Sequence, residues 1–94
     1  MILSFRDKRT AAFARGERVA AFQSIEKQGH RRLNILDAAT CVEDLRALPS
    51  NNLEMLQGDR RMHYSIRINR QWRVCFEWPE GDAGPSNVEI VDYH

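Results

Sequence analysis

The chain is poor in the residues that mark several specialised classes of protein. Its two cysteines, Cys41 and Cys75, are too few and too far apart for a disulfide framework or a zinc site. No apolar run approaches the roughly 20 residues that cross a bilayer, and no signal-peptide pattern is present. We therefore expect a soluble, cytoplasmic protein with free thiols and no contact with a membrane.

The chain also lacks an excess of either charge. Its 14 Lys and Arg residues nearly balance 13 Asp and Glu residues, for a formal net charge of +1, so total charge does not indicate nucleic-acid binding. The basic residues are nevertheless clustered, at 27–32 and again between residues 60 and 73. A solvated surface accounts for such clusters about as well as a binding site does.

Size and periodicity predict one α+β domain. The chain has 94 residues, 43% of them hydrophobic, which allows one core and leaves no room for a second. We expect a short strand at 2–6, then a helix that Asp7 caps and Gly16 ends. A longer helix should follow from 19 to about 39, because apolar residues recur there every three or four positions.

The second half of the chain has the pattern of a sheet. Residues 40–43 have the spacing of a capping box and predict one extra helical turn before Pro49. The apolar period then changes to two. The expected strands are 53–57, 63–69, 70 or 71 to 78, and 88–93. The resulting order, β-α-α-β-β-β-β, places two helices on one face of a mostly antiparallel sheet.

Alternation along these strands predicts which side chains a ligand can reach. In the strand that ends at residue 78, the apolar side chains take one face, while Arg73 takes the other. In the preceding strand, Arg67 likewise alternates with apolar neighbours. We therefore expect Arg67 and Arg73 to share the face that points away from the helices and to be exposed there.

Five residues at strands or strand ends have the chemistry for RNA cleavage. Without a metal, this reaction requires a base for the 2′-hydroxyl proton, an acid for the 5′ leaving oxygen and a cation for the charge on phosphorus. Glutamate or histidine can act as the base, histidine as the acid and arginine as the cation, while tyrosine can stack on a nucleobase. The five candidates are Glu54, Arg73, Asp92, Tyr93 and His94.

Each candidate also has a purely structural explanation, since an arginine on a strand is most often a surface ion-pair partner. The sequence has no clear metal cluster, glycine-rich phosphate loop or Ser-His-Asp pattern that supports another chemistry, and no cofactor is expected. Residue types alone thus predict a small α+β domain and suggest a nuclease.

Five segments carry a resemblance to a known family. They are 1–5, 36–45, 53–59, 65–73 and 87–94, and together they span nearly the whole chain in the same order. The most specific part is Asn69-x-x-Trp72-Arg73 followed by Asp92-Tyr93-His94. In these segments the chain resembles the HigB-type toxins of bacterial toxin–antitoxin modules, within the RelE/ParE superfamily.

The resemblance implies a RelE-like fold and a ribosome-dependent mRNA endonuclease that cuts codons in the 30S A site. It further implies neutralisation by a HigA-like antitoxin, with operator DNA bound only through the toxin–antitoxin complex. Arg73 would stabilise the phosphoryl transition state, and Asp92, Tyr93 and His94 would form the active-site end. The residues that we expect to bind RNA are Lys27, Arg31, Arg60, Arg61 and Arg67.

The chain departs from the family where some members carry a histidine and a lysine, because it has Glu54 and Gln57 there. This departure favours Glu54 as the general base with His94 as the acid, although Asp92 could accept the same proton. A different class of function also stays open, in which a ParE-like or inactive family member acts through protein contacts alone.

Overall fold

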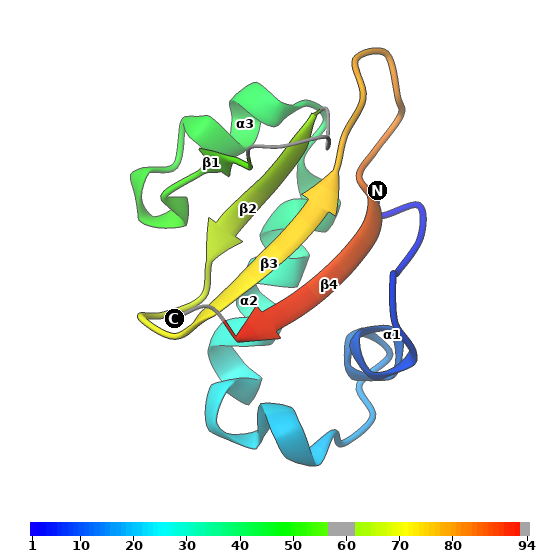
Figure 1. The fold of residues 1–94 in the computed structure, drawn as a ribbon, viewed down its shortest axis with the longest axis vertical. Coiled ribbons are helices and arrows are strands. Elements are labelled where there is room, and N and C mark those ends of the chain that lie inside the picture. Colours follow the sequence, from blue (N-terminus) through cyan, green and yellow to red (C-terminus); the bar gives the residue numbers. More distant parts are fainter. Residues whose placement is uncertain (57–61, 93–94) are drawn as a thin grey trace.

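A four-stranded antiparallel sheet forms the centre of the molecule, in a computed structural model that describes residues 1–56 and 62–92. Neighbouring strands are all antiparallel, which confirms the predicted α+β class. In chain order and side by side (Figure 1), the strands are β1 (Glu54–Met55), β2 (His63–Arg67), β3 (Trp72–Glu77) and β4 (Ser86–Asp92).

The helices are arranged around one face and both edges of this sheet. In Figure 1, α2 (Glu26–Ala38) lies behind the sheet, α1 (Lys8–Ala14) lies near the end of β4, and α3 (Val42–Arg46) lies near β1. Two short 3-10 helices complete the set: η1 (Ala20–Ile25) lies between α1 and α2, and η2 (Pro49–Asn51) lies between α3 and β1. Among the helices in the described ranges, none has the length and apolar character needed to cross a membrane.

The predicted boundaries of the first helix are confirmed. The side chain of Asp7 accepts a hydrogen bond of 3.2 Å from the backbone N–H of Thr10, and α1 begins at the next residue after Asp7. Gly16 follows the helix with a φ of 92°, a left-handed conformation that glycine adopts without strain. This turn redirects the chain toward η1.

Three sequence-based details are wrong. Residues 2–6 do not form a strand: they make an isolated parallel bridge, Phe5 to Val88, and backbone hydrogen bonds to residues 85–88, where Asn87 has a left-handed φ of 50°. The predicted long helix begins as the 3-10 helix η1, where the fully buried Phe22 and Ile25 point to the same side three residues apart.

The third detail is the expected capping box before α3. Asp44 rather than Glu43 provides the acceptor. Its carboxylate accepts hydrogen bonds of 2.9 Å from both the backbone N–H and the hydroxyl of Thr40. These hydrogen bonds hold the pKa of Asp44 below its usual value. The extra helical turn itself is confirmed.

The hydrophobic core fills the space between the sheet and α2. The sheet residues that face this core are Tyr64, Ile66, Val74, Phe76, Val88 and Ile90, and the helical residues opposite them are Phe13, Phe22, Ile25, Leu33 and Leu36. Complete burial of one such side chain contributes about 1.5–3 kcal/mol. One face of the sheet is therefore committed to packing, and function must use the other face or the surface of the helices.

Gly29 lies where α2 packs against α1, and its lack of a side chain is required there. A Cβ at this position would lie 3.0 Å from both Cε2 and Cζ of Phe13. The ring of Phe13 cannot easily move, because it is buried and stacks on the ring of His30 with 4.0 Å between centroids.

We expect Gly29→Ala to lower the free energy of unfolding. Overpacking costs about 1–3 kcal/mol, which exceeds the roughly 1 kcal/mol by which alanine favours a helix over glycine. Urea denaturation followed by circular dichroism measures the difference. Phe13→Leu in the same chain removes the obstructing ring atoms and should reduce the penalty, whereas a Gly29→Ala variant more stable than the parent would contradict this packing.

Candidate active site

The face of the sheet that points away from α2, here called the outer face, brings several predicted site residues together. The strand register places Arg67 directly opposite Arg73 and Glu54 directly opposite Ser65. Because side chains alternate along a strand, all four belong to the same face. The prediction that Arg67 and Arg73 share a face is thus confirmed, and Glu54 joins them from β1.

Arg73 is buried, contrary to the expected exposure, with a relative accessibility of 8%. Its Nε donates to the hydroxyl of Ser65 at 2.8 Å, and its Nη2 donates to the carbonyls of Asn52 at 2.6 Å and Ser65 at 3.4 Å. The side chain therefore lies along the sheet across β2 rather than projecting into solvent. These three contacts orient the guanidinium.

Arg67 lies beside Arg73 on the next strand and is partly exposed. Its Nε donates to the carbonyl of Asn69 at 3.1 Å, which ties the side chain to the turn between β2 and β3. Like charges directly opposite one another on two strands repel, and their Cβ atoms are typically about 5 Å apart. A bound anion would relieve this repulsion, so the pair is well suited to a phosphate.

Glu54 lies on the edge strand β1 with an exposed side chain. Its cross-strand partner is Ser65, the same residue whose hydroxyl accepts from Arg73. Glu54 and Arg73 therefore flank one serine from opposite sides. A carboxylate that can accept a proton and a fixed guanidinium that can stabilise negative charge are both next to this position.

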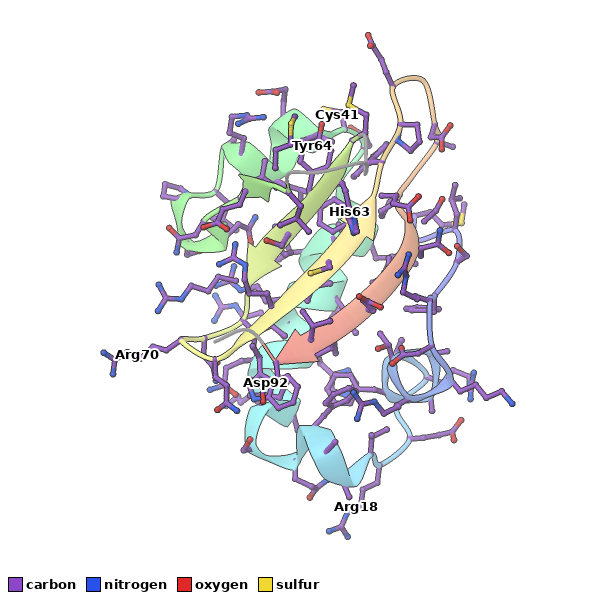
Figure 2. The ribbon with its side chains drawn as sticks, in the orientation of Figure 1. Arg18, Cys41, His63, Tyr64, Arg70 and Asp92 are labelled. Atoms are coloured by element: carbon purple, nitrogen blue, oxygen red, sulfur yellow. The ribbon has the colours of Figure 1, made fainter. Side chains whose placement is uncertain are left out.

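Asp92 is placed differently from the rest of the predicted site. It pairs with Trp72 at the end of β4, and it accepts a hydrogen bond of 3.0 Å from the side-chain amide of Gln71 (Figure 2). By alternation it lies on the side of Trp72 and Ile90, away from Arg73. Glu54 is on the opposite edge strand, three strand spacings or about 14 Å away.

The other predicted site residues divide into two groups. Lys27 and Arg31 are exposed on the surface of α2, where they line a groove of about 700 Å³ with His30, Ile35 and Ala38. This groove is on the far side of α2 from the sheet, so the structure does not bring it together with Arg73. The remaining predicted residues lie outside the described residues: Gln57, Arg60, Arg61, Tyr93 and His94.

Sequence reasoning missed the residues that hold Arg73. Ser65 is fully buried, and Asn52 has a left-handed backbone with φ of 45°. One signal was present, because an Asn-Asn pair after Pro49 is typical of a turn that uses the left-handed region. Nothing in the sequence indicated that its carbonyl would meet an arginine 21 residues later. Within 1–56 and 62–92, no group of three or more His, Cys, Asp or Glu side chains is arranged to hold a metal.

Comparison with known proteins gives a consistent result. Residues 3–94 match the model of a family described as the RelE-like toxin of type II toxin–antitoxin system HigB. Toxin HigB-1 of Vibrio cholerae serotype O1 is 40% identical over 85 residues, which cover 88% of this chain and 90% of the relative. Endoribonuclease HigB of Proteus vulgaris is 38% identical over 63 residues, which cover 67% of this chain and 65% of the relative.

Proposed function

Since the chain belongs to the HigB-like toxins of type II toxin–antitoxin systems, we propose that it is a ribosome-dependent mRNA endonuclease neutralised by a HigA-like antitoxin. The observation that carries the proposal is the arrangement on the outer face. Arg73 is fixed against Ser65 and Asn52, with Arg67 opposite it and Glu54 on the neighbouring edge strand.

In the proposed reaction, Glu54 removes the proton from the 2′-hydroxyl of the nucleotide to be cut. The 2′-oxygen then forms a bond to phosphorus, and the bond from phosphorus to the 5′-oxygen breaks. Arg73, oriented by its contacts with Ser65 and Asn52, stabilises the charge that builds up on the phosphoryl oxygens. His94 returns a proton to the leaving 5′-oxygen, and the ring of Tyr93 stacks on an unpaired base.

The basic residues provide the proposed contacts to RNA. Arg67 is the nearest of them to Arg73 and would bind an adjacent phosphate. Arg60 and Arg61 would extend this contact along the message. Lys27 and Arg31 lie on α2 instead, so any contact that they make with RNA belongs to a second surface of the ribosome-bound toxin.

The proposed partners follow from membership in the family. A type II toxin acts with an antitoxin protein, and we propose that this antitoxin is HigA-like and that operator DNA is bound only through the complex. The proposed place of action is the 30S A site in the cytoplasm, away from membranes, and the reaction would require no metal in the toxin itself.

The products of cleavage test this reaction. Attack by the 2′-hydroxyl leaves one fragment with a 2′,3′-cyclic phosphate and the other with a 5′-hydroxyl. We therefore expect new mRNA ends in cells that express the toxin without antitoxin, and these ends should require phosphorylation by polynucleotide kinase before an adaptor can be ligated. Ends that carry a 5′-phosphate would contradict the proposed attack.

Two controls separate the parts of the proposal. Purified toxin should leave free mRNA intact and cut it on translating ribosomes, and equal cleavage of free mRNA would refute ribosome dependence. Growth arrest without any new mRNA ends would favour the ParE-like alternative, in which the toxin acts through protein contacts alone.

A further inference from the structure

Asn51 ties the segment before β1 to two helices. It is fully buried, and its side-chain Nδ2 donates to the carbonyl of Leu45, in α3, at 3.0 Å. Its Oδ1 accepts from Nη1 of Arg32, in α2, at 2.7 Å. Arg32 also donates to the hydroxyl of Ser50 at 3.3 Å. An arginine of α2 thus holds the turn at residues 50–52.

The next residue, Asn52, connects this turn to the candidate site. Its backbone is left-handed, with φ of 45° and ψ of 54°, a conformation that costs roughly 1 kcal/mol or more for a residue other than glycine. Its carbonyl accepts a hydrogen bond of 2.6 Å from Nη2 of Arg73. Strand β1 begins two residues later, with Glu54. The turn therefore sets the position of both Arg73 and Glu54.

The environment of Arg32 fits a role in holding this turn. Partial burial, with a smaller effect from neighbouring Arg31, lowers the pKa of its guanidinium. Its hydrogen bonds described above go to the neutral oxygens of Ser50 and Asn51. Loss of Arg32 would leave the buried Oδ1 of Asn51 without its donor, which typically costs about 1–3 kcal/mol and would favour rearrangement of the turn.

We propose that Arg32 is a positioning residue for RNA cleavage, acting through Asn51 and Asn52 to place the guanidinium of Arg73 and the carboxylate of Glu54. This inference rests on the proposed function. It assigns a role in the reaction to a residue on α2, behind the sheet from the outer face (Figure 1). Small displacements of reacting groups are costly, since a shift of about 1 Å can reduce a rate by about 100-fold.

The first test measures cleavage of ribosome-bound mRNA by Arg32→Ala. We expect the single-turnover rate to fall by about 10- to 100-fold, while the ribosome concentration for half-maximal cleavage stays unchanged. Arg32→Lys, which can still donate to Asn51, should recover part of the rate. The matched control is Arg18→Ala, because Arg18 is exposed in the segment between α1 and η1, at the lower end of the molecule in Figure 2 and outside the strands that carry the candidate site.

A double-mutant cycle then separates positioning from an independent effect. In a chain that already carries Arg73→Ala, Arg32→Ala should cause a smaller fold-loss of rate than in the parent chain, because one of the two groups that it positions is gone. If the two losses multiply, or if Arg32→Ala alone leaves the rate unchanged, the inference is overturned.

A third measurement does not depend on activity. The Nε–H of Arg73, hydrogen-bonded to Ser65, should give a distinct signal in a ¹⁵N NMR spectrum, identified by its absence in Arg73→Lys. We expect this signal to shift in Arg32→Ala and to stay in place in Arg18→Ala. An unshifted signal in a folded Arg32→Ala variant overturns the positioning role even if cleavage is never observed. Should Arg32→Ala not fold, Arg32→Lys and Arg32→Gln provide the same comparison.

Discussion

Arg73→Ala is expected to abolish growth arrest and to slow cleavage of ribosome-bound mRNA by about 10²–10³-fold, the usual effect of losing a preorganised group that stabilises a transition state. The guanidinium is held by Ser65 and Asn52 before any substrate arrives, so its charge needs no reorganisation during the reaction. Growth after induction and single-turnover cleavage rates measure the effect.

The substitution also removes the donor to the buried hydroxyl of Ser65 and to the carbonyl of Asn52. This costs about 1–3 kcal/mol of stability, so thermal unfolding must show that each variant remains folded at the assay temperature. Arg73→Lys keeps the charge but cannot make the separate Nε and Nη2 contacts that orient the guanidinium, and we expect it to be impaired as well. A folded Arg73→Ala variant that cleaves at the parental rate would remove Arg73 from the proposed mechanism.

The sequence predicts the sheet well because its strands have a clear period of two. Alternation alone assigns Arg67 and Arg73 to one face, and the register confirms it. The same pattern predicted a strand at residues 2–6, where it failed. The described segment there makes one bridge to Val88, since strand formation also depends on the shape of the neighbouring edge.

The burial of Arg73 could not be predicted, because it depends on tertiary contacts. Local pattern places an arginine on the side of the strand opposite the core, and the usual consequence is exposure. Here the side chain lies over Ser65 and reaches the carbonyl of Asn52. That carbonyl is available only because Asn52 is left-handed and Asn51 is fixed by α2 and α3, a combination that no single segment specifies.

The position of Asp92, by contrast, could have been derived from the sequence. Val88 and Ile90 are apolar, are both buried, and are four and two residues from Asp92, respectively, so alternation assigns Asp92 to their side of the sheet. The family resemblance instead implies that Asp92, Tyr93 and His94 together form the active-site end. Adjacent strand residues point to opposite faces. Because Val91 pairs with Arg73, the next residue, Asp92, points to the face opposite that of Arg73.

Glu54→Gln is expected to slow cleavage by about 10²–10⁴-fold, because it keeps the shape of the side chain and removes the proton acceptor. Asp92→Asn should have a much smaller effect. Glu54 shares the outer face with Arg73 and lies opposite Ser65, whereas Asp92 lies on the other edge strand and on the other side of the sheet. Single-turnover rates of the two variants, measured side by side on the same ribosomes, give the comparison, with Glu80→Gln in the exposed β3–β4 loop as the matched control.

The comparison is decisive because the two carboxylates lie on opposite edge strands, at least three strand spacings or about 14 Å apart, too far for both to reach one 2′-hydroxyl. Only one of them can therefore be the base in a given geometry of bound message. If Asp92→Asn cleaves slowly and Glu54→Gln cleaves at the parental rate, the general base lies at the β4 edge of the sheet and not at the β1 edge. If both variants cleave normally, neither carboxylate accepts the proton, and the base must be sought among the other residues around Arg73.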